Sequence, residues 1–314
     1  MISEKDPWES IPKERHLDFK VVGEPLKSLA EATINKLERE WPKEFSDIPG
    51  AQVLFRLLTL VAVTSYETTK YFCADKPEDS ARKISFGSSA PPLLRSLLDE
   101  LYTAVFIGDD VGSRVAWYYR SGWREMAEHY ALYKERYSEE SAWRKWLEEY
   151  GRYLEVTRAD WGITEAEVAN LKAIQWWPIP PRMRKHPDLS EGSRNFFEYL
   201  EAWFYRELSQ ETHLSYPGLA HRGSTFLRGR DDPIKESEWR KKRSDAVGYA
   251  IVLLLAFLSE VICLCGFDLY GRCRYLWGVL KEYLPFAEEL YIERYRFLLE
   301  GASLSTRDPK TPER

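Results

Sequence analysis

The apolar segment at residues 246–267, AVGYAIVLLLAFLSEVICLCGF, is the feature that most constrains the fold. Its length is close to the roughly 20 apolar residues that a helix needs to cross a bilayer. Glu260 lies inside it, however, and a lone carboxylate in the middle of a membrane costs about 3 kcal/mol. We therefore expect a helix that is buried at the centre of the protein, and no stable membrane span. The alternative is a membrane-associated protein that exposes residues 253–257.

The rest of the chain has the periodicity of helices. Apolar residues recur at helical spacing in residues 26–41, and residues 51–73 are apolar on most faces, which is typical of an interior helix. Strand-like alternation and hairpin dipeptides do not occur. We predict an all-α fold, a multi-helix bundle around the buried apolar helix. Further helices are expected to end near residues 108, 137, 158, 174, 283 and 301, and one more begins near residue 192. The apolar helix itself is expected to begin near residue 234 and to end at residue 266 or 271.

The length and the two ends of the chain indicate one large domain. A chain of 314 residues is enough for one large domain or two modest ones. Scattered proline and charge predict an irregular N-terminal arm at residues 1–25, followed by a single helical domain at residues 26–303. Residues 304–314 are expected to form a disordered tail. The N-terminus lacks the apolar run of a signal peptide.

Composition limits the kinds of partner. A net charge of −5 does not favour nucleic-acid binding over the whole surface, so RNA would need a local basic patch. The 12 Trp and 19 Tyr favour thick helical cores and protein interfaces. The cysteines lack the CxxC pairs or histidine companions of a zinc site, so we expect core packing, no metal, no cofactor and a cytoplasmic location. The four cysteines are Cys73, Cys263, Cys265 and Cys273.

Most catalytic motifs do not occur in the sequence. There is no phosphate-binding loop, dinucleotide fingerprint or HExxH motif. A di-iron site would need two Glu-x-x-His pairs on facing helices, whereas the one weak candidate is Glu125 with His129. Gly108, Asp109 and Asp110 are similar to the carboxylate turn of polymerases but lack flanking strands. We therefore expect a simple turn there.

One helical face carries candidate catalytic residues. Arg206, Ser209, Gln210 and His213 stand at positions i, i+3, i+4 and i+7, so a helix places them on one side. Arg206 and His213 would lie about 10 Å apart along the helix axis. An arginine binds phosphate through charge-assisted hydrogen bonds, and a histidine can exchange a proton near neutral pH. Such a pair can cleave RNA without a metal, with His213 as general base, Arg206 on the phosphate and Ser209 as an orienting hydroxyl.

Basic residues follow this face in the sequence. In a chain that is acidic overall, they form a concentrated patch that can anchor a polyanion such as RNA. Acidic residues between them dilute the charge, so an ordinary solvated loop is the alternative interpretation. The candidate substrate-binding residues in this patch are His221, Arg222, Arg228 and Arg230.

The Arg206 to His213 spacing resembles the Arg-x(4–6)-His signature of the HEPN superfamily, whose helical nucleases often act as dimers with facing motifs. Residues 94–100 (LRSLLDE), Trp177 with Pro178, and residues 205–209 (YRELS) resemble, in the same order, parts of domain of unknown function 5677. That family of uncharacterised bacterial helical proteins is linked to HEPN-like toxins and anti-phage defence. It often has a small residue and Gly or Pro directly after the histidine, whereas here Leu214 follows.

Two classes of function are therefore open. The resemblance implies a HEPN-like, metal-independent ribonuclease or toxin module in bacterial anti-phage defence, which acts on RNA as a homodimer. The competing hypothesis is a non-enzymatic helical scaffold or sensor that binds a protein partner through Trp- and Tyr-rich faces. In that case Arg206 would pair with a carboxylate such as Glu100 in an internal polar network that also holds Ser209 and His213.

Overall fold

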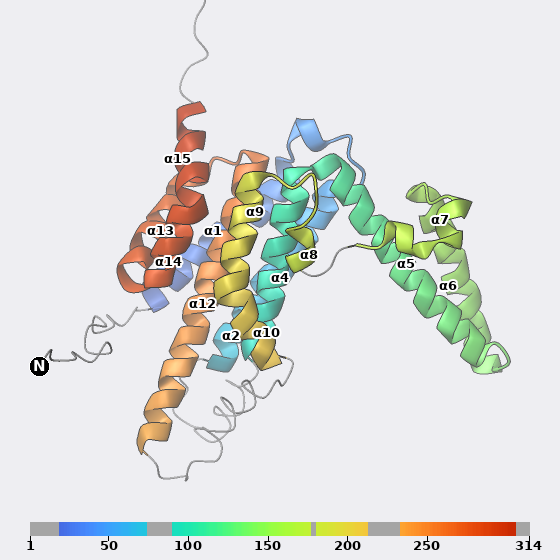
Figure 1. Ribbon diagram of the computed structural model, residues 1–314, viewed down its shortest axis with the longest axis horizontal. Helices are drawn as coiled ribbons and strands as arrows, with labels where there is room; N and C mark the ends of the chain where they lie inside the picture. The colour runs from blue at the N-terminus through green and yellow to red at the C-terminus, as the bar shows by residue number, and fades with distance from the viewer. Residues whose placement is uncertain (1–18, 74–89, 177–179, 213–232, 306–314) are drawn as a thin grey trace, which may run out of the picture.

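Helices make up all the regular structure in the part of the chain that the computed structural model describes. This part comprises residues 19–73, 90–176, 180–212 and 233–305, and it confirms the all-α prediction (Figure 1). π-helical turns at Glu201–Tyr205 and Tyr291–Tyr295 connect α9 to α10 and α14 to α15. The α-helices are α1 (Phe19–Arg39), α2 (Ala51–Cys73), α4 (Ala90–Asp109), α5 (Val111–Tyr137), α6 (Ser141–Asp160), α7 (Glu165–Ala169), α8 (Pro180–Met183), α9 (Glu191–Leu200), α10 (Arg206–Thr212), α12 (Pro233–Cys265), α13 (Tyr270–Tyr283), α14 (Pro285–Leu290) and α15 (Arg296–Ser305).

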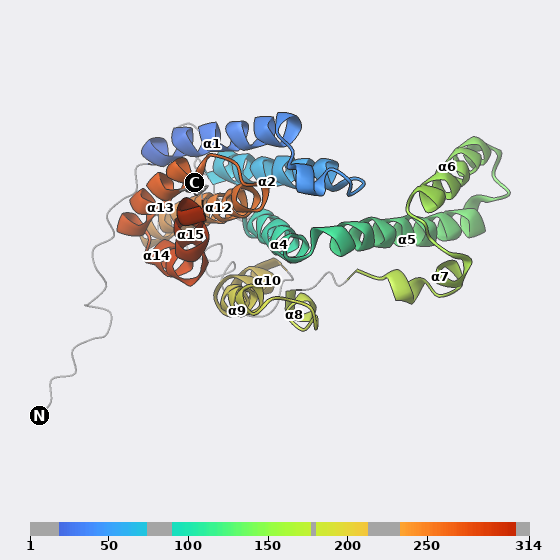
Figure 2. The ribbon, with the colours of Figure 1, turned by 90° about the horizontal axis from the view of Figure 1, so that it is seen from above.

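Helix α12 lies at the centre of the bundle, as the sequence predicts. Residues 250–258 are each at most 1% exposed, because α1, α2, α4 and α13 pack around them (Figure 2). By length and composition the stretch Lys241–Cys265 is apolar enough to cross a membrane, and its most apolar window has a mean hydropathy of 2.4. However, 83% of its most apolar window is buried inside the protein. In this structure α12 is therefore the core helix of the bundle.

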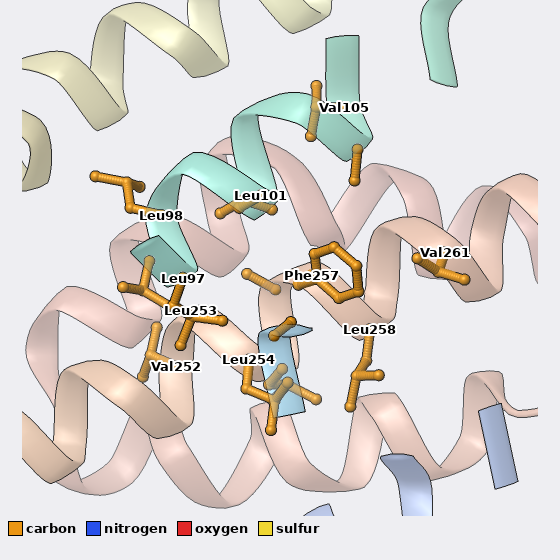
Figure 3. Packing of buried hydrophobic residues seen from close by; sticks show 14 of the residues in the cluster. Leu97, Leu98, Leu101, Val105, Val252, Leu253, Leu254, Phe257, Leu258 and Val261 are labelled. Carbon is orange, nitrogen blue, oxygen red and sulfur yellow. The ribbon is translucent and has the colours of Figure 1, made fainter. Parts of the chain in front are cut away.

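The contact between α4 and α12 forms the middle of the core. Leu97, Leu101 and Val105 of α4 lie over Leu253 and Phe257 of α12 (Figure 3). All five side chains are at most 2% exposed. Burial of each such side chain stabilises the fold by about 1.5–3 kcal/mol. This packing fixes α4, the helix on which the candidate site rests.

Glu260, the charged residue of the apolar segment, is neutralised by an arginine from another element. Arg294 donates hydrogen bonds to both carboxylate oxygens of Glu260, from Nη2 at 2.9 Å and from Nε at 2.5 Å. Burial alone would lower the pKa of Arg294, but the adjacent carboxylate outweighs burial and holds this pKa above its ordinary value. The ion pair allows a carboxylate to stay in a core helix, where an unpaired charge would be strongly destabilising.

The ends of the helices follow the signals in the sequence at most positions. A capping box of Thr164 and Glu167 is present at the start of α7, as a threonine followed three residues later by a glutamate favours. Asp110 caps α5 through its side chain. Ser138 does not cap the next helix, because its backbone is still α-helical and it ends α5. Helix α6 instead begins after Glu140, which makes no side-chain capping bond.

Helix α1 begins at Phe19, inside the stretch that the sequence assigns to an irregular arm at residues 1–25. Pro25 lies within this helix, where a proline interrupts the backbone bonding at a cost of about 3 kcal/mol. Val22, Leu26 and Leu29 are each at most 1% exposed in the main core. Their burial outweighs the cost of the proline. Residues 1–18 lie outside the described residues.

Helices α5, α6 and α7 form an arm that projects from the bundle (Figures 1 and 2). The arm has its own small hydrophobic cluster, which contains Trp123, Leu154, Ile163 and Ile174. The indole Nε1 of Trp123 donates a hydrogen bond to the carbonyl of Leu154 at 2.9 Å, which ties α5 to α6. The arm is therefore held together by a core separate from that around α12.

Candidate functional site

Arg206 lies at the start of α10, directly after a π-helical turn. Its backbone N–H donates to the carbonyl of Glu201, five residues earlier. Such a turn inserts an extra residue into an otherwise α-helical run, and π turns are frequent at functional sites. The buried side chains of Phe204 and Leu208, which are 4% and 6% exposed, anchor the helix on both sides of Arg206. The backbone at this position is therefore fixed by the core.

The side chain of Arg206 is exposed. Among the side chains described, no ion pair joins it to Glu100, so the internal network with that carboxylate, which was the alternative interpretation, is not formed. Ser209, one turn further along α10, is half-buried. The structure therefore places Arg206 and Ser209 on one short helix, with the arginine facing solvent.

The remaining predicted site residues lie outside the described residues. These are the general base His213 and the four candidate substrate-binding residues of the basic patch. Their roles stay predictions from the sequence. The four are His221, Arg222, Arg228 and Arg230.

Tyr205, beside Arg206, connects α10 to α4. The guanidinium of Arg95 stacks over the Tyr205 ring, 3.6 Å from its centroid, and Tyr102 meets the same ring edge-on at 6.3 Å. Arg95 also donates from Nε to both oxygens of Asp99, four residues further along α4, at 3.1 and 3.0 Å. Residues 94–100 and residues 205–209 are therefore in contact.

Burial changes the acidity of two carboxyl groups on α4. It raises the pKa of Asp99 even though Arg95 acts in the opposite direction. Burial, together with the charge of Asp99, raises the pKa of Glu100 to about 7, and a hydrogen bond with Ser96 offsets only part of this. Glu100 therefore exchanges its proton near neutral pH, a property that is common at functional sites.

A half-open cavity of about 260 Å³ lies between α4 and α5. Its lining includes two acidic residues, Asp99 and Glu125, and three aromatic ones, Tyr102, Tyr118 and Trp176. Glu125, named above with His129, thus lines this cavity. Carboxylates repel a phosphate backbone, so the cavity is unsuited to RNA. A phosphate ligand would instead approach the exposed side of α10.

The Asp109–Asp110 turn, expected to be a simple turn, fixes the start of α9. The Asp109 carboxylate accepts hydrogen bonds from the backbone N–H of Ser190 at 2.6 Å and from its hydroxyl at 2.9 Å. It accepts a third bond from the Ser193 hydroxyl at 2.7 Å. Because α9 leads through the π turn into α10, Asp109 contributes indirectly to the position of Arg206.

The cysteines are unreactive residues of the core. All four are free and at least partly buried. Burial raises the pKa of the Cys73 thiol to about 11, and those of Cys265 and Cys273 to about 12. Within the described ranges, no three His, Cys, Asp or Glu side chains gather into a group that could hold a metal ion.

Comparisons with protein-family models, with curated proteins and with solved structures find no match. The functional interpretation therefore depends on the chain's own residues and geometry.

Two features of the site were not expected from the sequence. The π turn has no compositional signal, because bonding five residues back needs no special residue type. The raised pKa of Glu100 depends on its burial, which its position in the sequence alone does not reveal.

Proposed function

We propose that the polar face of α10 cleaves RNA without a metal ion. One observation carries the proposal: Arg206 is exposed at the start of a helix whose other side is buried through Phe204 and Leu208. A guanidinium in this position is accessible to a phosphate from solution, and it can make two parallel hydrogen bonds to the phosphate oxygens. On this proposal the chain is a toxin-like ribonuclease module of bacterial anti-phage defence.

The contacts that hold α10 in place favour this function. Asp109 fixes the start of α9, and the stack of Arg95 on Tyr205 fixes α10 against α4. The helix is therefore held in place before any ligand binds. Pre-organised positioning of this kind lowers the entropic cost of bringing a catalytic group to its substrate.

The proposed reaction is an internal transesterification of RNA. His213 removes the proton from a ribose 2′-hydroxyl, and the oxygen then attacks the adjacent phosphorus. Arg206 stabilises the negative charge of the phosphorane, while Ser209 orients one of its oxygens. The bond from phosphorus to the 5′-oxygen breaks, and that oxygen takes a proton from water. The products are a 2′,3′-cyclic phosphate and a 5′-hydroxyl end. Phosphates on either side of the cut bind the patch formed by His221, Arg222, Arg228 and Arg230.

The test measures cleavage of an end-labelled single-stranded RNA by the purified full chain in a buffer that contains EDTA. We expect cleavage by the wild type. His213→Ala and Arg206→Ala should each lower the rate by at least about 100-fold, the usual contribution of a general base or a charge-stabilising donor. Arg272→Ala is the matched control, because Arg272 is also exposed but lies on α13. Its rate should equal that of the wild type.

Two results would overturn the proposal. One is a wild-type protein that leaves every tested RNA intact, and the other is full cleavage by the His213→Ala protein. Circular dichroism and thermal unfolding of each variant separate a lost activity from a lost fold. Because Arg206 is exposed, its substitution should leave the unfolding temperature unchanged.

The arm favours a second candidate function, a scaffold that binds another protein. Aromatic rings stack along α5 and α6: Tyr137 lies on Trp143 with centroids 4.4 Å apart, and Trp146 lies on Tyr150 at 4.9 Å. Trp146 and Tyr153 are still 37% and 50% exposed. Rigid, partly exposed aromatic side chains are typical of the energetically dominant residues in protein interfaces.

A double variant, Trp146→Ser with Tyr153→Ser, distinguishes the two functions. The scaffold function predicts that this variant loses cellular toxicity or phage protection while His213→Ala keeps it. The ribonuclease function predicts the reverse. Full cellular activity of the double variant would exclude a scaffold role for this aromatic face.

A further inference from the structure

Helix α2 is only partly the interior helix that its sequence predicts. One side packs against α1, α4 and α12, but the opposite side is exposed. Of the fifteen large hydrophobic residues exposed in the described part of the chain, five lie on this one helix. They are Val53 (56% exposed), Leu57 (53%), Leu60 (40%), Val61 (44%) and Tyr71 (65%).

These residues form one continuous stripe, which we call the α2 stripe. Steps of three and four residues keep them on one face of the helix, along about 27 Å from the first to the last. Thr64 and Thr68 fill the gap before Tyr71. Their hydroxyls donate to backbone carbonyls of α2 itself, at 2.8 and 2.7 Å. The hydroxyls of both threonines are therefore satisfied without water, and this part of the helix surface can be buried at little cost.

Two opposite charges border the α2 stripe in a symmetric way. Arg56 and Glu67 are eleven residues apart, which is close to three full turns, so both lie along the same edge of the stripe. Each is about 8 Å along the helix from the point between Val61 and Ala62. The stripe itself, from Val53 to Tyr71, is centred on Ala62, within about 1 Å of this point. A helix with this pattern is complementary in charge to an antiparallel copy of itself.

We propose that a second copy of this chain covers the α2 stripe, with the two α2 helices antiparallel about a two-fold axis beside Val61 and Ala62. The edge that carries Arg56 and Glu67 on one α2 helix then faces the same edge of the other α2 helix. Arg56 of each copy lies opposite Glu67 of the other, so the contact contains two identical ion pairs. A closed, isologous contact of this type is the commonest form of homodimer.

Arg56 and Glu67 already make ion pairs within one chain, but these pairs are too weak to prevent the pairing proposed across the dimer. Arg56 lies 3.4 Å from Glu38, and Glu67 lies 3.6 Å from Lys70, with all four side chains at least 41% exposed. Exposed ion pairs of this kind each stabilise the folded chain by only about 0–1 kcal/mol. In the dimer the same side chains meet across a contact from which the apolar stripe excludes water, and the attraction is stronger there.

The size of the contact sets the expected affinity. Two antiparallel α2 faces would bury on the order of 1,000 Å² in total, at the lower end of specific protein interfaces. We therefore expect a dimer that forms and dissociates with concentration in the micromolar range. This inference is independent of the proposed RNA cleavage, since the α2 stripe contains none of the residues assigned to that reaction.

Sedimentation velocity of the purified full chain over a wide range of concentration tests the dimer. The wild type should shift from monomer to dimer as its concentration rises. Leu57→Glu should stay monomeric, because it places a charge in the stripe at a position already 53% exposed and so does not disturb the core. Phe297→Glu is the matched control. Phe297 is 67% exposed on α15, and its substitution should leave the dimer unchanged.

Charge variants test the identity and the register of the partner. Arg56→Glu alone and Glu67→Arg alone should each be monomeric, because like charges then meet twice across the axis. An equimolar mixture of the two variants should dimerise again, since every introduced charge faces an opposite one. The proposal is overturned if the wild type is monomeric at all concentrations, if Leu57→Glu dimerises normally, or if the mixture is no better than its components. The last result would indicate a different register or a different partner.

Discussion

Two glutamates of the bundle show how the neighbours of a carboxyl group decide its charge. Glu260 lies in the apolar helix but is paired with Arg294 through two hydrogen bonds. Glu100 lies beside the like charge of Asp99, and burial has the largest effect on it, so its pKa rises to about 7. The first is a fixed ion pair. The second changes its charge in the physiological range.

The raised pKa of Glu100 predicts a pH-dependent effect of the substitution Glu100→Gln. The folded protein binds this proton more tightly than the unfolded chain, whose carboxyl titrates near 4.5. Ionisation of Glu100 therefore lowers the free energy of unfolding as pH rises from about 4.5 to 7. Removal of the charge should stabilise the protein by about 2 kcal/mol at pH 8 but by only about 0.5 kcal/mol at pH 5. Urea unfolding at the two pH values measures this difference.

Glu148→Gln is the control for this measurement. Glu148 is exposed on α6, so its substitution should change the free energy of unfolding equally little at both pH values. An equal effect of Glu100→Gln at pH 5 and pH 8 would contradict a raised pKa for Glu100.

At the scale of helices, short polar contacts decide where the element that bears the candidate site begins. The Asp109 carboxylate joins the end of α4 to the start of α9 through three hydrogen bonds. The neighbouring Asp110 makes a single capping bond, which it accepts from the N–H of Ser113 at 3.2 Å. Two adjacent aspartates thus contribute to the ends of two different helices.

This difference predicts unequal effects of two alanine substitutions. Asp109→Ala removes three charge-assisted bonds and should destabilise the protein by about 2–3 kcal/mol, whereas Asp110→Ala should cost about 1 kcal/mol. Hydrogen exchange should be faster at the first amides of α9 in Asp109→Ala but not in Asp110→Ala. Equal exchange in both variants would show that Asp109 does not hold α9.

The elements of this fold were predictable from the sequence wherever the signal is local. The apolar run at residues 246–267, the capping box at Thr164 and the pair of Arg95 with Asp99 all depend on residues within a few positions of one another. The outward side of α2 was not predictable, because apolar residues on it indicate burial without indicating what covers them. The surroundings of Arg206 and Glu100 were not predictable either, because they depend on contacts between helices distant in the sequence.

At the scale of the molecule, the described chain contains two hydrophobic clusters. The larger one surrounds α12, and the smaller one around Trp123 holds the arm. Regions with separate cores often open separately, each with its own free energy. We therefore expect the arm and the bundle to unfold as two units.

Two tryptophan substitutions test this separation. Trp123→Ala should cost about 3–5 kcal/mol within the arm, so the amides of α6 exchange faster while those of α12 stay protected. Trp277→Ala should speed up exchange throughout the bundle, because Trp277 is fully buried and donates to Ser259 of α12 at 3.1 Å. Loss of α12 protection in Trp123→Ala would show that the chain unfolds as one unit instead.

The central claim, that the polar face of α10 cleaves RNA, is tested most directly by the chemistry of the cut ends. Mass spectrometry of the products should find a 2′,3′-cyclic phosphate on the upstream fragment and a 5′-hydroxyl on the downstream fragment. An RNA with a single 2′-deoxynucleotide at the cleavage position should stay intact there, because the attacking hydroxyl is missing. A 5′-phosphate end, or cleavage at the deoxynucleotide, would contradict the account.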